Sequence, residues 1–122
     1  MYPRFKKLAQ RGADFLGVEY PILCGAMTWI SDAGLVAAIA EHGGFGLLAA
    51  GNLPPEKLEE EIARIRTLTS KPFGVNLITI APNFRRHLEI ACAAQCPFIV
   101  FAGALPDGPS VLAAKNSGAC VM

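Results

Sequence analysis

A single polar side chain interrupts a segment that otherwise has the composition of a buried strand. Asn76 lies within Phe73–Ile80, a stretch rich in Phe, Val and Ile. A buried carboxamide that lacks hydrogen-bond partners costs about 1–3 kcal/mol, so we expect this one to have a partner. The partner is either a neighbouring loop or a ligand that presents a polar ring edge or a phosphate.

The second candidate is the segment Cys24–Trp29, which follows the first predicted strand. Gly25 and Ala26 are small, so the backbone amides there can approach a flat ligand closely, and Met27 and Trp29 can form a wall beside it. Large apolar side chains near a strand end are also common core residues. Both interpretations remain open from the spacing alone.

Neither histidine is predicted to act as a catalyst. His42 lies at a predicted helix end, where an imidazole interacts with the carbonyl end of the helix dipole. His87 is expected on a solvated helix face beside two arginines. Cys92 and Cys96 are four residues apart on a predicted helix, but no second ligand pair lies nearby, so we interpret them as core residues and predict no metal site.

The common nucleotide and nucleophile motifs are not found in the sequence. There is no Gly-x-Gly-x-x-Gly, no phosphate-binding loop that ends in Lys-Ser or Lys-Thr, and no Gly-x-Ser-x-Gly. A hydrolase with a Ser/His/Asp nucleophile system is therefore not indicated.

Strands and helices alternate in units of about 25 residues, which is typical of parallel strands joined by right-handed helical crossovers. Residues Met1–Gly12 are expected to form a short leading helix or arm. The predicted strands are Tyr20–Leu23, Phe45–Ala50, Phe73–Ile80, Pro97–Ala102 and Ala119–Met122. The predicted helices are a segment capped by Ser31 and Asp32 and ended by Gly43-Gly44, then Glu56–Leu68, Pro82–Ala94 and Pro109–Asn116. Leu58, Ile62, Ile65 and Leu68 form the predicted buried face of the second of these helices.

This order predicts an α/β fold, the N-terminal half of a TIM (β/α)8 barrel, with residues 1–122 as a single incomplete, truncated domain. A complete barrel takes roughly 200 residues or more. A flavodoxin-like sheet of five strands also suits the length, but its first loop would carry a phosphate-binding run that Met27 and Trp29 do not supply. Ligands bind at the carboxyl ends of parallel strands, so Asn76 and the segment Cys24–Trp29 are expected at one rim.

Composition excludes several classes of partner. The chain has 122 residues, of which 52% are hydrophobic and 17% charged, and its formal net charge is +1. That charge creates no field that would attract nucleic acid or an anionic membrane. No apolar run reaches the roughly 18 residues of a spanning helix. The basic N-terminal residues are followed by Gln10, Arg11, Gly12 and Asp14 rather than by the apolar stretch of a signal peptide, and the four cysteines lie in apolar segments, so we expect a cytoplasmic protein.

Four motifs resemble those of the nitronate monooxygenase (2-nitropropane dioxygenase) family and occur in the same order as in that family. They are Glu19–Ile30, Gly43-Gly44-Phe45-Gly46, Gly51-Asn52 and Lys71–Leu77. The flavin-dependent enoyl-acyl carrier protein reductases share these motifs. The resemblance covers nearly the whole chain, and four spaced motifs together are more specific than any one alone.

The resemblance implies an FMN-containing (β/α)8 barrel. It implies that Gly25, Ala26, Met27 and Thr28 meet the flavin, and that Asn76 matches the family asparagine beside FMN. Ala26 stands where the family often has glycine. The resemblance places the family's catalytic histidine beyond Met122, so no catalytic residue is assigned in this chain, and we expect little activity from the chain alone.

The implied activity is FMN-dependent oxidation of alkyl nitronates with O2, which yields a carbonyl compound and nitrite. The alternative is an enoyl-acyl carrier protein reductase that uses FMN and NAD(P)H, with an enoyl thioester as substrate. An alternative from another class is a non-catalytic interaction module that self-associates through open sheet edges, because unpaired edge strands present free N–H and C=O groups.

Overall fold

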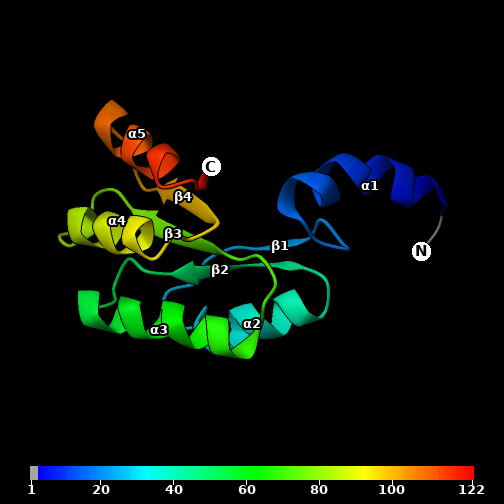
Figure 1. Ribbon diagram of the computed structural model, residues 1–122, viewed down its shortest axis with the longest axis horizontal. Helices are drawn as coiled ribbons and strands as arrows, with labels where there is room; N and C mark the ends of the chain where they lie inside the picture. The colour runs from blue at the N-terminus through cyan, green and yellow to red at the C-terminus, as the bar shows by residue number, and fades with distance from the viewer. Residues whose placement is uncertain (1–2) are drawn as a thin grey trace.

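The structure is a computed structural model that describes residues 3–122. Five parallel strands form one sheet in sequence order, and helices connect them (Figure 1). The elements are α1 (Pro3–Leu16), β1 (Leu23–Cys24), α2 (Ala33–Glu41), β2 (Phe45–Ala49), α3 (Pro55–Leu68), β3 (Gly74–Ile78), α4 (Phe84–Ala93), β4 (Phe98–Ala102), α5 (Gly108–Asn116) and β5 (Cys120–Val121). The predicted α/β fold, with parallel strands and helical crossovers as in the N-terminal half of a TIM barrel, is confirmed.

The first strand differs from its prediction. Tyr20–Leu23 was expected, but β1 begins only at Leu23, which pairs with Phe45 of β2. Pro21 has no N–H to give to a ladder, and the Ile22 N–H donates to the Tyr20 carbonyl at 2.7 Å, which makes a tight turn instead. The leading helix, in contrast, runs past Gly12 to Leu16, and residues 1 and 2 lie outside the described part.

Side chains alternate between two faces of the sheet. Val75, Leu77 and Ile99 point toward the helices, where they form the larger core with apolar side chains of α3 and α4. Phe45, Leu47 and Phe98 point to the opposite face, here called the inner face, where they pack with Leu16 of α1. Gly74 and Asn76 are two residues apart in β3, so their side-chain positions lie on the same face of the sheet. A Cβ at Gly74 would contact Leu47, which places Asn76 on the inner face as well.

Helix α1 lies at the amino-terminal end of the sheet. The rings of Phe15 and Phe98 meet edge to face with centroids 5.8 Å apart, and those of Phe45 and Phe98 are 4.8 Å apart. Phe45 and Phe98 are the first residues of β2 and β4, and Figure 1 shows α1 on the side away from the arrowheads. The opposite edge, where the strands end, is formed by the loops that lead into the helices. We call that edge the carboxyl rim.

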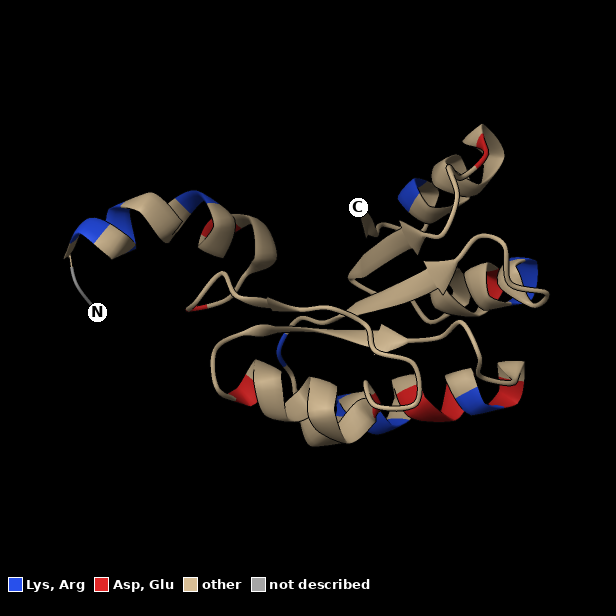
Figure 2. Cartoon of the chain, turned by 180° about the vertical axis from the view of Figure 1, so that it is seen from behind, with Lys and Arg blue, Asp and Glu red and all other residues tan. Residues whose placement is uncertain are grey.

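Within the helices and strands, the charged residues all lie on helices, and the five strands carry none (Figure 2). Helix α3 shows the pattern most clearly, with Leu58, Ile62 and Ile65 buried as predicted. Leu68 was also predicted to be buried, but it is the last residue of α3 and is 48% exposed. No helix among residues 3–122 is long and apolar enough to cross a membrane.

Cys96 is buried in the larger core and Cys92 packs half-buried against it, so their interpretation as core residues is confirmed. Burial raises the pKa of the Cys96 thiol to about 11. Since the thiolate is the reactive form, we expect iodoacetamide at pH 8 to modify half-buried Cys24 and to leave Cys96 unmodified until urea unfolds the chain. Peptide mass spectrometry would measure this, and equal labelling of the two cysteines in the folded protein would contradict it.

Candidate functional site

The segment after β1, residues 25–32, forms a closed turn around one buried hydroxyl. We call this segment the β1–α2 loop. The Met27 N–H donates to Ser31 Oγ at 2.8 Å, and the Ser31 N–H donates to the Met27 carbonyl at 2.9 Å. Ser31 Oγ lies 3.4 Å from the Gly25 carbonyl, to which it donates. Ser31 was predicted to cap α2 together with Asp32, but only Asp32 does so, by accepting from the Leu35 N–H at 2.9 Å.

The same loop leaves backbone donors free beside open space. Among residues 3–122, the N–H groups of Gly25 and Ala26 donate no hydrogen bond. A Cβ placed on Gly25 would meet no atom within 4 Å, whereas the Ala26 methyl packs against the inner-face cluster. Met27 is 42% exposed and Thr28 is exposed. Free donors, open space and an apolar floor suit a flat ligand with acceptor atoms on its edge.

Asn76 presents a free carboxamide on the inner face. It lies in β3 level with Ala49 of β2 and Val100 of β4. The prediction that this amide is buried is wrong, because the residue is half-buried and water can solvate it. Its side chain makes no hydrogen bond to any described residue, so the first of the two alternatives, a bond to a neighbouring loop, is not observed. Its backbone carbonyl accepts from the Ala50 N–H at 3.2 Å.

The β1–α2 loop and Asn76 both lie toward the carboxyl rim. Register places Cys24 beside Gly46 and Asn76 beside Ala49, so the residues that follow Cys24 rise to the level of Asn76. The Ala49 N–H also donates to the Ser31 carbonyl at 3.1 Å, which ties the loop to the end of β2. Strands β1 and β3 flank β2, so about 10 Å separates them, and one planar ligand can reach both.

Apolar side chains surround this part of the rim. Trp29, Ile80 and Leu105 follow β1, β3 and β4, and they are 75%, 74% and 94% exposed. Trp29 has a φ of +65°, a left-handed conformation that is uncommon for a bulky residue. Thr79 joins the last two of these loops, since its hydroxyl accepts from the Ala104 N–H at 2.8 Å. The rim therefore offers apolar contact around a few free polar groups.

The two histidines have structural positions. His42 Nδ1 lies 2.7 Å from the Ala38 carbonyl at the end of α2, as predicted. The prediction that His87 faces solvent is wrong, because it is fully buried, with Nε2 2.9 Å from the Leu53 carbonyl. It shares the buried face of α4 with Phe84 and Ala91, at spacings of three and four, and its arginine neighbours face outward.

A cleft of about 390 Å³ lies between the β1–α2 loop, the end of β2 and α3. Glu61 lines this cleft and is only 4% exposed, and it was not among the residues predicted to be functional. The signal was present, because Glu61 is three residues after Leu58 and four before Ile65, on the buried face of α3. Lys57 also lines the cleft, and hydrogen bonds to Glu60 and Glu61 raise its pKa.

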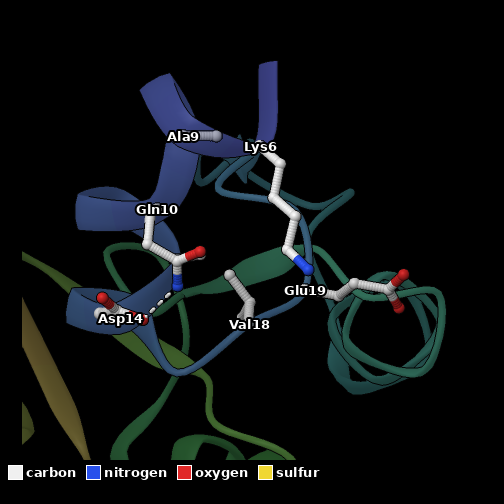
Figure 3. A pocket seen from close by; sticks show the side chains of 7 residues that line it. Lys6, Ala9, Gln10, Asp14, Val18 and Glu19 are labelled. Atoms are coloured by element: carbon white, nitrogen blue, oxygen red, sulfur yellow. Dashed lines mark hydrogen bonds between the residues drawn. The ribbon is translucent and has the colours of Figure 1, made fainter. Parts of the chain in front are cut away.

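Another hollow of about 300 Å³ lies beside α1 (Figure 3). Lys6, Gln10 and Asp14 of α1 line it together with Val18 and Glu19 of the following segment. Gln10 donates to Asp14 at 2.7 Å, and the Lys6 side chain extends toward the backbone at Glu19. This hollow adjoins the helix that covers the amino-terminal end of the sheet, so none of the predicted site residues lines it.

Comparisons with known proteins identify the family and the fold. The family model described as nitronate monooxygenase matches residues 9–96. A Mycobacterium tuberculosis protein named (3aS,4S,5R,7aS)-5-hydroxy-7a-methyl-1-oxo-octahydro-1H-indene-4-carboxyl-CoA dehydrogenase is 31% identical over 109 residues, which are 89% of this chain and 30% of that protein. A probable nitronate monooxygenase of Staphylococcus haemolyticus is 45% identical over 62 residues, 51% of this chain and 17% of that protein.

The structure of FabK from Thermotoga maritima superposes with a TM-score of 0.85 and 33% sequence identity, over 91% of this chain and 35% of that chain. The chain therefore spans about a third or less of the length of each of these proteins. The family match includes both the β1–α2 loop and Asn76.

Proposed function

Since the chain belongs to the nitronate monooxygenase family, we propose that it supplies the flavin-facing part of an FMN-dependent oxidoreductase that oxidises alkyl nitronates with O2. The observation that carries the proposal is the pairing of free backbone donors at Gly25 and Ala26 with the free carboxamide of Asn76 at one rim. The name of the staphylococcal relative supports the choice of nitronates as substrates.

The described residues fit the flavin ring. In this proposal the N–H groups of Gly25 and Ala26 donate to acceptor atoms on the ring edge, and the Asn76 carboxamide bonds the same ring from β3. Met27 and Thr28 would lie beside the ring and exclude water from it. FMN, when bound, supplies the redox chemistry that these side chains lack. His42 and His87 both lie against backbone carbonyls, so we propose no catalytic role for either.

A flavin titration of the 122-residue chain tests this proposal. Because the proposed contacts hold the ring and not the phosphate, we expect riboflavin and FMN to bind within about threefold of each other, with dissociation constants on the order of 100 µM or weaker. Gly25→Ala and Asn76→Ala should each weaken binding about fivefold to tenfold. Flavin fluorescence measures the affinity.

The control is Gly108→Ala, because a Cβ at Gly108, like one at Gly25, meets no protein atom within 4 Å. Both glycine variants should keep the wild-type unfolding midpoint, so a loss of flavin binding in Gly25→Ala alone reports the ligand contact. The proposal fails if neither flavin binds at millimolar concentration, or if Gly25→Ala and Asn76→Ala bind flavin as well as wild type.

A second candidate is an oxidoreductase that acts on an acyl thioester. The M. tuberculosis relative, which aligns over 89% of this chain, is named as the dehydrogenase of a carboxyl-CoA. Activity assays on an FMN-loaded protein that contains this chain would distinguish the two candidates. Release of nitrite from propyl nitronate supports the first, whereas consumption of NADH with crotonyl-CoA supports the second.

A further inference from the structure

Glu61 of α3 binds the backbone of a different helix. Its Oε2 accepts from the Ala33 N–H at 2.7 Å, in a buried contact between residues 28 positions apart in the sequence. Ala33 is the first residue of α2, where backbone N–H groups have no partner within the helix. Glu61 therefore caps α2 from outside, and its negative charge is favourable at that end of the helix dipole.

The burial of this carboxylate is compensated. Lys57 Nζ lies 3.4 Å and Arg64 Nη1 lies 3.8 Å from Glu61 Oε1, one turn away on either side along α3. The side chains of Lys57 and Arg64 are 50% and 55% exposed, so water can solvate them without the glutamate. The polar atom that depends most on Glu61 is the buried N–H of Ala33.

The residues before Ala33 connect it to the candidate site. Ser31 lies two positions earlier, and its hydroxyl accepts from the Met27 N–H and donates to the Gly25 carbonyl. Trp29, in the same turn, has the left-handed backbone conformation described above, which persists only where the surrounding structure holds it. A shift of the first turn of α2 would therefore move Ser31 and loosen the turn at Met27.

We propose that Glu61 is a positioning residue that fixes the first turn of α2 and, through Ser31, the conformation of the β1–α2 loop that faces the flavin. Its role in flavin binding rests on the function proposed above. The contact within the protein can be tested without any flavin.

The test compares Glu61→Leu, which removes the acceptor, with Glu61→Gln, which keeps one. In Glu61→Leu we expect the amides of Ala33 and Met27 to exchange with solvent at least about tenfold faster, and riboflavin affinity to fall about fivefold. In Glu61→Gln, which keeps a neutral and weaker acceptor, exchange at both amides should rise about twofold and affinity should stay near wild type. Amide exchange is followed by NMR on the ligand-free chain.

Two control variants separate positioning from general stability. Glu60→Gln changes an exposed carboxylate on the same helix and should alter neither amide. Ser110→Ala removes a buried hydroxyl that contacts Arg85 on the α4–α5 side, so it should lower stability and leave Met27 exchange and riboflavin affinity unchanged.

Each outcome decides a separate claim. Faster exchange at Met27 in Glu61→Leu, with partial rescue in Glu61→Gln, supports the positioning role. Faster exchange at Ala33 with no change at Met27 overturns it, because Glu61 then stabilises only the helix. If Glu61→Leu does not fold, an unchanged Met27 amide in Glu61→Gln overturns the role. Absence of flavin binding in wild type overturns the proposed function, and the exchange data still decide the contact from Glu61 to the loop.

Discussion

Replacing Gly46 with alanine is expected to lower the free energy of unfolding by about 3 kcal/mol. A Cβ at this position would lie 2.9 Å from Val36 Cα and 3.0 Å from the Val36 carbonyl oxygen. Both are backbone atoms of α2, so no side-chain rotation can relieve the clash, and α2 must move away from β2. The first turn of α2 adjoins the β1–α2 loop, so the candidate site should be disturbed as well.

Urea unfolding followed by circular dichroism measures this effect. Gly25→Ala is the matched control, because the added methyl meets no atom within 4 Å. Gly74→Ala should cost less than Gly46→Ala, because its Cβ would first meet Leu47 Cδ2, the end of a flexible side chain. An unfolding midpoint for Gly46→Ala equal to that of Gly25→Ala would show that α2 is not in contact with β2 at this point.

Much of the architecture follows from local sequence. Segments such as Phe98–Ala102 are continuous apolar runs of strand length, which a sheet buried on both faces requires. Pro72 and Gly43 lie between elements where a helix must end. β1 was misplaced because the apolar letters at Tyr20 and Ile22 do not reveal that the Ile22 N–H closes a local turn.

The errors at buried polar residues have a common physical origin. His87 was assigned by its charged neighbours Arg85 and Arg86, although adjacent residues on a helix point in different directions. Ser31 was assigned by its type, although a hydroxyl before a helix can bond to any nearby backbone group. The partner of His87 lies on another element and those of Ser31 lie earlier in the same loop, and residue type alone does not contain that information.

The candidate site was predicted in part. Asn76 was found because a carboxamide is unusual in an apolar strand, and the small residues at Gly25 and Ala26 were found because they precede larger ones. Their common level on the sheet depends on the register between β1, β2 and β3. The absence of partners for the Asn76 side chain, among the residues described, emerged only from the folded arrangement.

Replacing His87 with alanine is expected to lower the free energy of unfolding by about 3–4 kcal/mol. The imidazole is 0% exposed, so its removal leaves a cavity under α4. A carbonyl can only accept, so Nε2 must donate to the Leu53 oxygen, and the variant also leaves that oxygen without its partner. Leu53 lies in the segment between β2 and α3, so that segment should lose protection from amide exchange beyond the global change. Chemical unfolding and NMR exchange measure the two effects.

Two other variants of α4 distinguish the energetic effect of losing the hydrogen bond from that of losing the buried ring. His87→Gln keeps a side-chain N–H donor, so it should recover roughly half of the loss and most of the protection near Leu53. Arg86→Ala changes the adjacent residue, whose ion pairs with Glu59 and Glu89 are exposed, and should cost no more than about 0.5 kcal/mol. If His87→Ala were as stable as Arg86→Ala, His87 would not be packed between α4 and the Leu53 segment. Destabilisation by His87→Ala with no local change at Leu53 would instead assign its effect to burial alone.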